Sequence, residues 1–85
     1  MKVYTVEIAP AVKKRIKRVP NADKKKILDT IESLGQNPRP NGYKKLIGYS
    51  EFFRFRVGNY RIIYQIHDEI LIVAVVEVVD RRDAY

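Results

Sequence analysis

The most regular pattern of apolar and polar positions spans residues 53 to 64, with the sequence FRFRVGNYRIIY. Apolar and polar residues alternate on both sides of a central Gly-Asn pair, which is typical of two antiparallel strands joined by a two-residue turn of type II′. This turn places Arg56 opposite Arg61. It also places Arg54 opposite Ile63. All three arginines therefore share one face of the hairpin, and the other is a core face made of Phe53, Phe55, Val57, Tyr60, Ile62 and Tyr64.

Two helices are predicted in the N-terminal half. Apolar residues recur at helical spacing from Pro10, a residue type suited to a first helical turn, until Pro20 stops the pattern. The second helix is expected to start near Asn21 or Ala22. Its expected end is Gly35, because glycine is common just beyond a helix C-terminus. The apolar positions expected to be buried on this helix are Ile27, Leu28, Ile31 and Leu34.

Strands are predicted at both ends of the chain. Residues 2 to 8 alternate, and the continuous apolar run ILIVAVVEVV after Glu69 is typical of a strand in the middle of a sheet. Residues 36 to 49 are rich in Pro, Gly and Asn and are expected to form a long loop. The register of the last strand depends on the length of the turn that precedes it, because two-residue and three-residue turns place Glu77 on opposite faces of the sheet. We place Glu77 on the arginine face, since a lone carboxylate in the core would cost more free energy.

These elements follow in the order strand, helix, helix, strand, strand, strand. The order predicts one α+β domain spanning residues 1 to 85, with two layers: both helices pack on one face of a four-stranded antiparallel sheet. The other face is open and holds Arg54, Arg56 and Arg61. Arginines converge where an anion is held in a defined geometry. They also lie on solvated faces with their stems over apolar surface, so the pattern leaves both interpretations open.

Composition narrows the classes of function. The 85 residues include no cysteine, which excludes disulfides, a thiolate nucleophile and a cysteine-based zinc site. The N-terminus has no apolar leader, and the longest apolar run, residues 70 to 76, is too short to span a bilayer, so we expect a cytoplasmic protein without a membrane partner. A formal net charge of +7 and a pI near 9.8 favour a polyanionic partner.

Two segments of the chain resemble motifs of the RelE/ParE toxin superfamily, in its RelE-like branch. KKLIGYSEFFRFRVGNYRIIYQI is similar to the family's Leu-x-Gly, aromatic-Arg-x-Arg-x-Gly-x-Tyr-Arg-x-x-Tyr core, and VVDRRDAY is similar to its basic C-terminal motif. The resemblance implies the toxin of a type II toxin-antitoxin system. It also implies an enzyme that enters the ribosomal A site and cuts mRNA by attack of a 2′-hydroxyl on the adjacent phosphate, without metal ion or cofactor. The implied partners are a cognate antitoxin, the ribosome with its RNA, and mRNA.

The resemblance also implies roles for individual residues. Arg61 matches an arginine that contacts the scissile phosphate. Arg54 and Arg56 stand where the best-known members carry lysines, one of which is implicated as the general base. This departure matters because arginine stays protonated in proteins, whereas lysine can give up its proton. Either Arg81 or Arg82 matches the arginine of the C-terminal motif. Tyr85 matches an aromatic residue that stacks on a base.

A proton acceptor and a surface for RNA complete the expected site. Glu77 is the first candidate for the general base, followed by Glu51 and Asp83, although Glu77 could instead only balance the charge of a neighbouring arginine, Arg61 or Arg81. Basic side chains dense on both helices and in the long loop suit contacts with the phosphate backbone of ribosomal RNA. The expected RNA-binding residues are Lys13, Lys14, Lys17, Lys24, Lys25, Lys44 and Lys45.

Two other functions compete with mRNA cleavage. One is a ParE-like toxin that inhibits DNA gyrase by protein contact and cuts nothing. The arginines and Tyr85 favour cleavage, because gyrase poisons of this fold generally lack that set. The other is a basic RNA-binding module without catalysis, which would explain the charge but leave the C-terminal motif unexplained.

Overall fold

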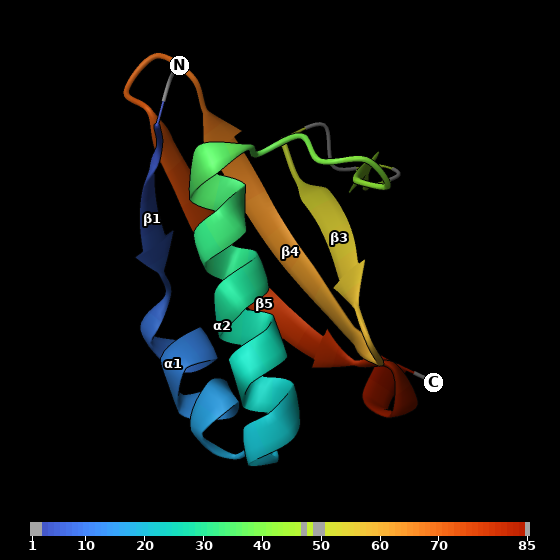
Figure 1. Ribbon diagram of the computed structural model, residues 1–85. Helices are drawn as coiled ribbons and strands as arrows, with labels where there is room; N and C mark the ends of the chain where they lie inside the picture. The colour runs from blue at the N-terminus through green and yellow to red at the C-terminus, as the bar shows by residue number, and fades with distance from the viewer. Residues whose placement is uncertain (1–2, 47, 49–50, 85) are drawn as a thin grey trace.

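A five-stranded sheet with a long helix across one face makes up the computed structural model, which describes residues 3–46, 48 and 51–84 (Figure 1). The strands lie side by side in the order β1-β5-β4-β3-β2. The chain is an α+β fold, as predicted. Its elements are β1 (Thr5–Ile8), α1 (Pro10–Lys17), α2 (Asn21–Gln36), β2 (Lys44–Lys45), β3 (Phe53–Val57), β4 (Tyr60–His67), β5 (Ile72–Asp80) and the 3₁₀ helix η1 (Arg81–Ala84).

The sheet is mixed, so the predicted four-stranded antiparallel sheet is wrong in two respects. β1 runs parallel to β5, from Thr5 opposite Ile72 to Ile8 opposite Val75. A fifth strand, β2, pairs with β3 inside the segment expected to be a loop. Alternation shows that a segment is a strand but not which way its neighbour runs, and two residues are too few to show alternation at all.

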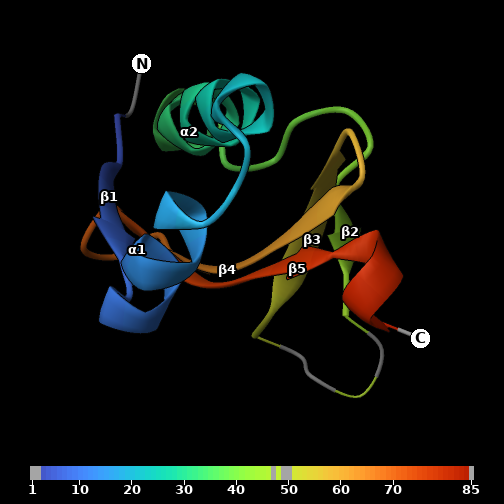
Figure 2. The same cartoon turned by 90° about the horizontal axis from the view of Figure 1, so that it is seen from below.

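The two helices occupy different positions against the sheet. In Figure 2, α2 forms a separate layer above the strands, whereas α1 lies at their level, next to β1. The backbone N–H of Ala9 donates to the carbonyl of Val75 at 3.0 Å, and there β1 ends. α1 then lies along the remainder of β5, with Val12 and Ile16 buried in the common core. None of the helices in the described part of the chain is long and apolar enough to cross a membrane.

The β3–β4 hairpin has the predicted register. Arg56 pairs with Arg61 and Phe55 with Ile62. The positive φ of 57° at Gly58, with no positive φ at the next residue, is that of a type II′ turn. The predicted core face is confirmed, because Tyr60, Ile62 and Tyr64 are buried while Phe53, Phe55 and Val57 pack against the core.

A β-bulge decides the face on which Glu77 lies. His67 pairs with Ile72 across a four-residue turn, and uninterrupted pairing from there would set Glu77 opposite Ile62 on the core face. The register shifts between Ile63 and Tyr64, so that Glu77 pairs with Ile63 instead. The predicted face for Glu77 is therefore confirmed, but its cause is the bulge, and both turn lengths considered from the sequence were wrong.

The C-terminal end of α2 differs from the prediction at Gly35. The helix continues to Gln36, and Gly35 is buried in its last turn because β1 approaches closely. A Cβ atom at this position would lie 2.8 Å from Cγ2 of Val6 and 3.0 Å from the carbonyl oxygen of Tyr4. Glycine is thus needed here for close packing rather than for a helix stop.

Leu28, predicted to be buried, is 41% exposed. Ile27, Ile31 and Leu34 are separated by four and three residues and form the buried stripe of α2, as predicted. Leu28 follows Ile27 directly and is therefore rotated by about 100° from this stripe.

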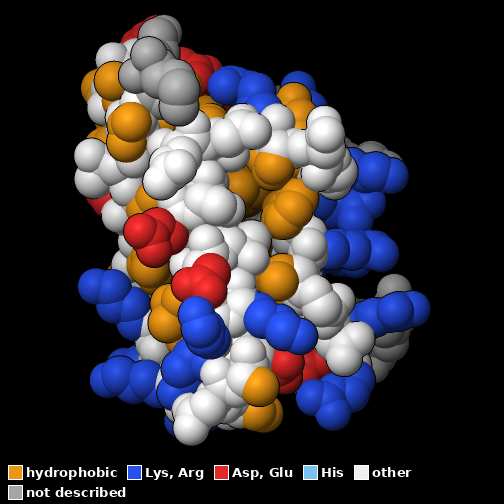
Figure 3. Space-filling model, viewed as in Figure 1, with side chains coloured by type: hydrophobic (Ala, Val, Ile, Leu, Met, Phe, Trp, Pro, Cys, Tyr) orange, Lys and Arg blue, Asp and Glu red, His pale blue; other side chains and the backbone are white. Residues whose placement is uncertain are grey.

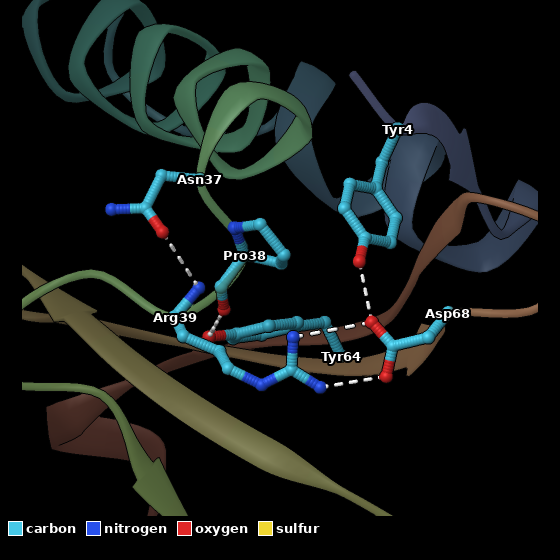
Figure 4. Close-up of polar contacts among 6 residues, drawn as sticks. All are labelled: Tyr4, Asn37, Pro38, Arg39, Tyr64 and Asp68. Carbon is cyan, nitrogen blue, oxygen red and sulfur yellow. Dashed lines mark hydrogen bonds and ion pairs between the residues drawn. The ribbon is translucent and has the colours of Figure 1, made fainter. Parts of the chain in front are cut away.

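A polar cluster joins three distant segments at the end of the sheet away from the hairpin turn (Figure 4). The Arg39 guanidinium makes a double contact with the Asp68 carboxylate, with Nη2 at 2.7 Å from Oδ2 and Nη1 at 3.2 Å from Oδ1. The Tyr4 hydroxyl donates to the same carboxylate. Tyr64 donates its hydroxyl to the carbonyl of Pro38 at 2.8 Å. The segment after α2 is thereby tied to the residue before β1 and to the β4–β5 turn.

Candidate anion-binding site

Basic side chains occupy two adjacent rows across the face of the sheet that points away from the core. Residues paired across neighbouring strands project to the same face. The first row consists of Lys44, Arg54, Ile63 and Glu77. The second row consists of Arg56, Arg61 and Val79. The hairpin register and the bulge together therefore produce this face.

Three arginines converge on one cavity at the end of the second row. The cavity has a volume of about 110 Å³ and lies where the hairpin turn meets the start of η1. The backbone N–H of Arg81 donates to the carbonyl of Asn59 at 2.7 Å, which attaches η1 to the turn. The cavity is lined by Arg56, Gly58, Asn59, Tyr60, Arg61, Val79 and Arg81. A bound anion would meet three guanidinium groups within this space.

The arginines of this face have no counter-charge within the described residues. Arg54, Arg56, Arg61 and Arg81 form no ion pair there, whereas Arg82 pairs with Asp80. Arg56 and Arg61 are direct cross-strand neighbours, and like charges in that position destabilise a sheet by a few tenths up to about 1 kcal/mol. An anion between them would remove this repulsion.

Arg81 and Arg82, which the sequence did not distinguish, point to different sides of the molecule. Arg81 joins Arg56 and Arg61 in the cavity. Nη2 of Arg82 lies 2.8 Å from Oδ2 of Asp80. The contacts with Arg82 hold the pKa of the Asp80 carboxyl below its usual value. Of these two arginines, only Arg81 is placed to act together with Arg56 and Arg61.

Arg82 lines a second, larger recess of about 560 Å³ between α1 and the start of η1. Lys14, Arg15 and Arg18 of α1 and the segment after it line the same recess, together with Tyr60 and Asp80. Local sequence patterns gave no signal that η1 would lie against Arg15 and Arg18.

The expected RNA-binding lysines lie on three separate surfaces. Those of α1 (Lys13, Lys14 and Lys17) and β2 (Lys44 and Lys45) are exposed, whereas on α2 Lys24 is half-buried and Lys25 pairs with Asp29 at 3.1 Å. Figure 3 shows Lys and Arg side chains gathered over α1 at the lower left and along the β3 side at the right. The positive charge is therefore distributed over several surfaces rather than gathered in one patch.

The candidate bases are not part of the arginine cavity. Glu77 is exposed in the neighbouring row and forms no ion pair with a described residue, so it does not balance Arg61 or Arg81 in this structure. Glu51 lies in the turn before β3, at the end of that strand opposite to Arg56. Tyr85 and the side chain of Asp83 lie outside the described residues.

An apolar hollow next to Arg54 was missed from the sequence. It has a volume of about 390 Å³ and is lined by Leu46, Phe52, Ile63, Val76 and Glu77. The one indication in the sequence was Ile63, an apolar residue at a position of the open face where alternation calls for a polar one. Among the residues that the structure describes, no group of three or more His, Cys, Asp or Glu side chains could hold a metal ion.

Comparisons with known proteins agree on one family. Residues 6–85 match the model of a family described as the ParE toxin of the type II toxin-antitoxin system, parDE. A protein named RelE1 from Methanocaldococcus jannaschii is 33% identical over 85 residues, covering 96% of this chain and 94% of that protein.

Two solved structures are similar over nearly their whole length. One is the archaeal RelE-RelB complex from Pyrococcus horikoshii OT3, with a TM-score of 0.83 and 27% identity, covering 95% of this chain and 97% of that one. The other is the toxin-antitoxin complex RelBE2 from Mycobacterium tuberculosis, with a TM-score of 0.82 and 25% identity, covering 93% of this chain and 99% of that one.

Proposed function

Because this chain belongs to the ParE toxin family of type II toxin-antitoxin systems, within the RelE/ParE superfamily, we propose that it is a ribosome-dependent endoribonuclease that cleaves mRNA in the A site. The observation that carries this proposal is the cavity in which Arg56, Arg61 and Arg81 converge without a counter-charge among the described residues. Such a cavity fits a phosphate, and an mRNA phosphate is the group on which an endoribonuclease acts.

The proposed reaction needs no group beyond the RNA and the protein. The 2′-oxygen of a ribose attacks the adjacent phosphorus, a bond from O2′ to phosphorus forms, and the bond from phosphorus to O5′ breaks. The 2′-hydroxyl loses its proton and the leaving O5′ gains one. A 2′,3′-cyclic phosphate and a 5′-hydroxyl are the products.

The arginines act on the charge that develops on the phosphorane. A positioned donor at a developing oxyanion is typically worth about 10²- to 10³-fold in rate, so three of them supply much of the acceleration. None of these side chains is suited to accept a proton. Arginine stays protonated. Tyr60, which also lines the cavity, keeps its proton because burial raises its pKa. These side chains therefore stabilise charge, and the proton of the 2′-hydroxyl leaves to a group outside the cavity.

The proposal extends to the partners of the protein. We expect a cognate antitoxin to bind it, because the similar structures from Pyrococcus horikoshii and Mycobacterium tuberculosis are complexes of a toxin with an antitoxin. The net charge of +7 favours an acidic antitoxin segment as well as ribosomal RNA.

A second candidate is a toxin that inhibits DNA gyrase by protein contact, as ParE-like members do. The matching family model is itself that of a ParE toxin, which favours this candidate. The arginine cavity favours cleavage, because contact with a protein target does not call for three guanidinium groups around one small space.

Mapping of mRNA 5′ ends tests the proposed function directly. Purified protein added to a defined translation reaction is expected to create new 5′ ends inside codons that occupy the A site, and none in mRNA without ribosomes. Growth arrest in cells without any new 5′ ends would contradict the proposal and favour the gyrase inhibitor.

Binding to ribosomes is expected to weaken at least about tenfold between about 50 and 200 mM salt, because lysines that contact phosphates release counterions. Each lost phosphate contact reduces the slope of log affinity against log salt by roughly 0.7. Replacing Lys13, Lys14 and Lys17 together by Ala is therefore expected to reduce this slope by about 2. Sedimentation with ribosomes at several salt concentrations measures both effects. An affinity that does not depend on salt would contradict a contact with phosphates.

A further inference from the structure

The apolar hollow beside the arginine cavity has an unusual composition for the open face of a sheet. Of the five described residues that line it, four are apolar: Leu46, Phe52, Ile63 and Val76. All four are half-buried, and two of them belong to the central strands β4 and β5. They line a space of about 390 Å³ that is open to a ligand.

Glu77 adds one carboxylate to this apolar lining. It is exposed, and it forms no hydrogen bond or ion pair with a described residue. The bulge in β5 places it here, opposite Ile63, rather than in the core. Bulges often direct a side chain into a functional site. The hollow thus combines an apolar lining with a carboxylate whose two oxygens can accept hydrogen bonds.

The hollow lies two residues along β4 and β5 from the arginine cavity. Ile63 follows Arg61 by two residues on β4, and Glu77 precedes Val79 by two residues on β5. Two residues of a strand span about 6.8 Å. An RNA strand whose phosphate contacts Arg61 can therefore place a neighbouring base over Ile63.

We propose that this hollow binds a guanine base of the cleaved RNA strand, with the Glu77 carboxylate accepting hydrogen bonds from the guanine N1–H and N2–H groups. Unpaired bases are commonly recognised by packing on aromatic or apolar side chains while their Watson–Crick edge is hydrogen-bonded. Guanine is the one base whose Watson–Crick edge presents two adjacent donors, which match the two oxygens of a carboxylate. Adenine, cytosine and uracil each present an acceptor beside the donor, and the carboxylate repels it. The inference rests on the proposed function, because the RNA strand that supplies the guanine is the mRNA substrate of that function.

Another occupant of the hollow would be an apolar side chain of an antitoxin. The charge of the site argues against this occupant, because the acidic segment expected to bind a chain of net charge +7 would meet Glu77 as a like charge.

Cleavage-site mapping with Glu77→Gln tests the inference. In the defined translation reaction, wild-type cleavage is expected to be enriched at guanine in one position relative to the cut, and Glu77→Gln is expected to lower this enrichment roughly 5- to 150-fold. The inference assigns Glu77 to binding the guanine base instead of accepting the 2′-hydroxyl proton, so cleavage at codons without guanine in that position is expected to change less than about threefold. Glu69 is also an exposed carboxylate, in the β4–β5 turn, so Glu69→Gln is the matched control and should leave the pattern unchanged.

Three results of the mapping would overturn the inference. They are wild-type cleavage without a guanine preference, an unchanged preference in Glu77→Gln, and an equal loss of cleavage at all codons in that variant. The last result would make Glu77 the general base.

A binding measurement decides the inference even if the wild type cleaves nothing. Guanosine 5′-monophosphate is expected to shift the backbone amide resonances of Ile63 and Val76, and to do so at a concentration at least about fivefold lower than uridine 5′-monophosphate. Glu77→Gln is expected to remove this difference. Absence of shifts at these two residues with the guanine nucleotide would overturn the inference independently of any activity.

Discussion

Replacing Arg61 by Ala is expected to slow mRNA cleavage at least about 100-fold while the protein stays folded. Arg61 lines the cavity together with Arg56 and Arg81. Its guanidinium would stabilise negative charge on the phosphorane there, and loss of such a donor costs about 10²- to 10³-fold. Folding is not expected to suffer, because Arg61 lies on the open face and its removal relieves the repulsion from Arg56. The measurement is the single-turnover cleavage rate on saturated ribosomes, with circular dichroism as the check on folding.

Arg18→Ala is the matched control for Arg61→Ala. Arg18 is an exposed arginine that lines the other recess, between α1 and η1, so its removal is expected to leave the single-turnover rate within about threefold. Arg81→Ala is expected to lower the single-turnover rate as well, but by less than Arg61→Ala. Arg82→Ala is expected to leave the rate within about threefold, as Arg18→Ala does. Full cleavage by Arg61→Ala, or an equal loss in Arg61→Ala and Arg18→Ala, would rule out the cavity as the catalytic site.

Replacing Tyr64 by Phe is expected to lower the free energy of unfolding by about 1–3 kcal/mol, although only one oxygen atom is lost. Tyr64 is fully buried, and its hydroxyl donates to the carbonyl of Pro38, which is also buried. Without the hydroxyl this carbonyl has no partner and no access to water, so the full cost of its desolvation appears. Urea unfolding of the two proteins measures the difference.

Tyr43→Phe provides the control for Tyr64→Phe. The Tyr43 ring packs on Phe53 with centroids 5.8 Å apart, and its hydroxyl makes no hydrogen bond with a described residue, so a change within about 0.5 kcal/mol is expected. Equal effects of the two substitutions would contradict the role given to the Pro38 contact.

Alkaline pH adds a second check on Tyr64. Burial raises the pKa of Tyr64 to about 12 from its ordinary value of 10.0. The unfolded chain therefore loses the phenolic proton first, and unfolding is increasingly favoured as the pH rises from 10 to 12. Because Phe has no proton to lose, the stability difference between the two proteins is expected to narrow over this range.

Local patterns in the sequence predicted a large part of the fold. The alternation around Gly58 predicted both the hairpin pairing and the face that carries Arg54, Arg56 and Arg61, because a two-residue turn leaves one register and each strand residue has a definite face. Helical spacing likewise predicted α1 and α2, and of the four expected buried positions on α2 only Leu28 is exposed. Such features depend on neighbours within a few residues.

The sequence did not predict how distant segments meet. The direction of β1, the strand β2 and the position of η1 beside Lys14 and Arg18 each depend on contacts between parts of the chain far apart in sequence. For the same reason the separation of Arg81 from Arg82 was not predictable, since it follows from the Asp80 contact on one side and the hairpin turn on the other.

The sequence by itself determined the arginine face, because alternation and a tight turn are local and leave one arrangement of the hairpin. Only the tertiary structure decided what lies next to that face. β5 has to bury Val73 and Val75 together with Val78, and strict alternation would bury Glu77 instead of Val78. A bulge satisfies the core by adding one residue, and it exposes Glu77 beside Ile63. The hydrophobic core, which involves the whole chain, thereby placed a carboxylate where no local pattern required one.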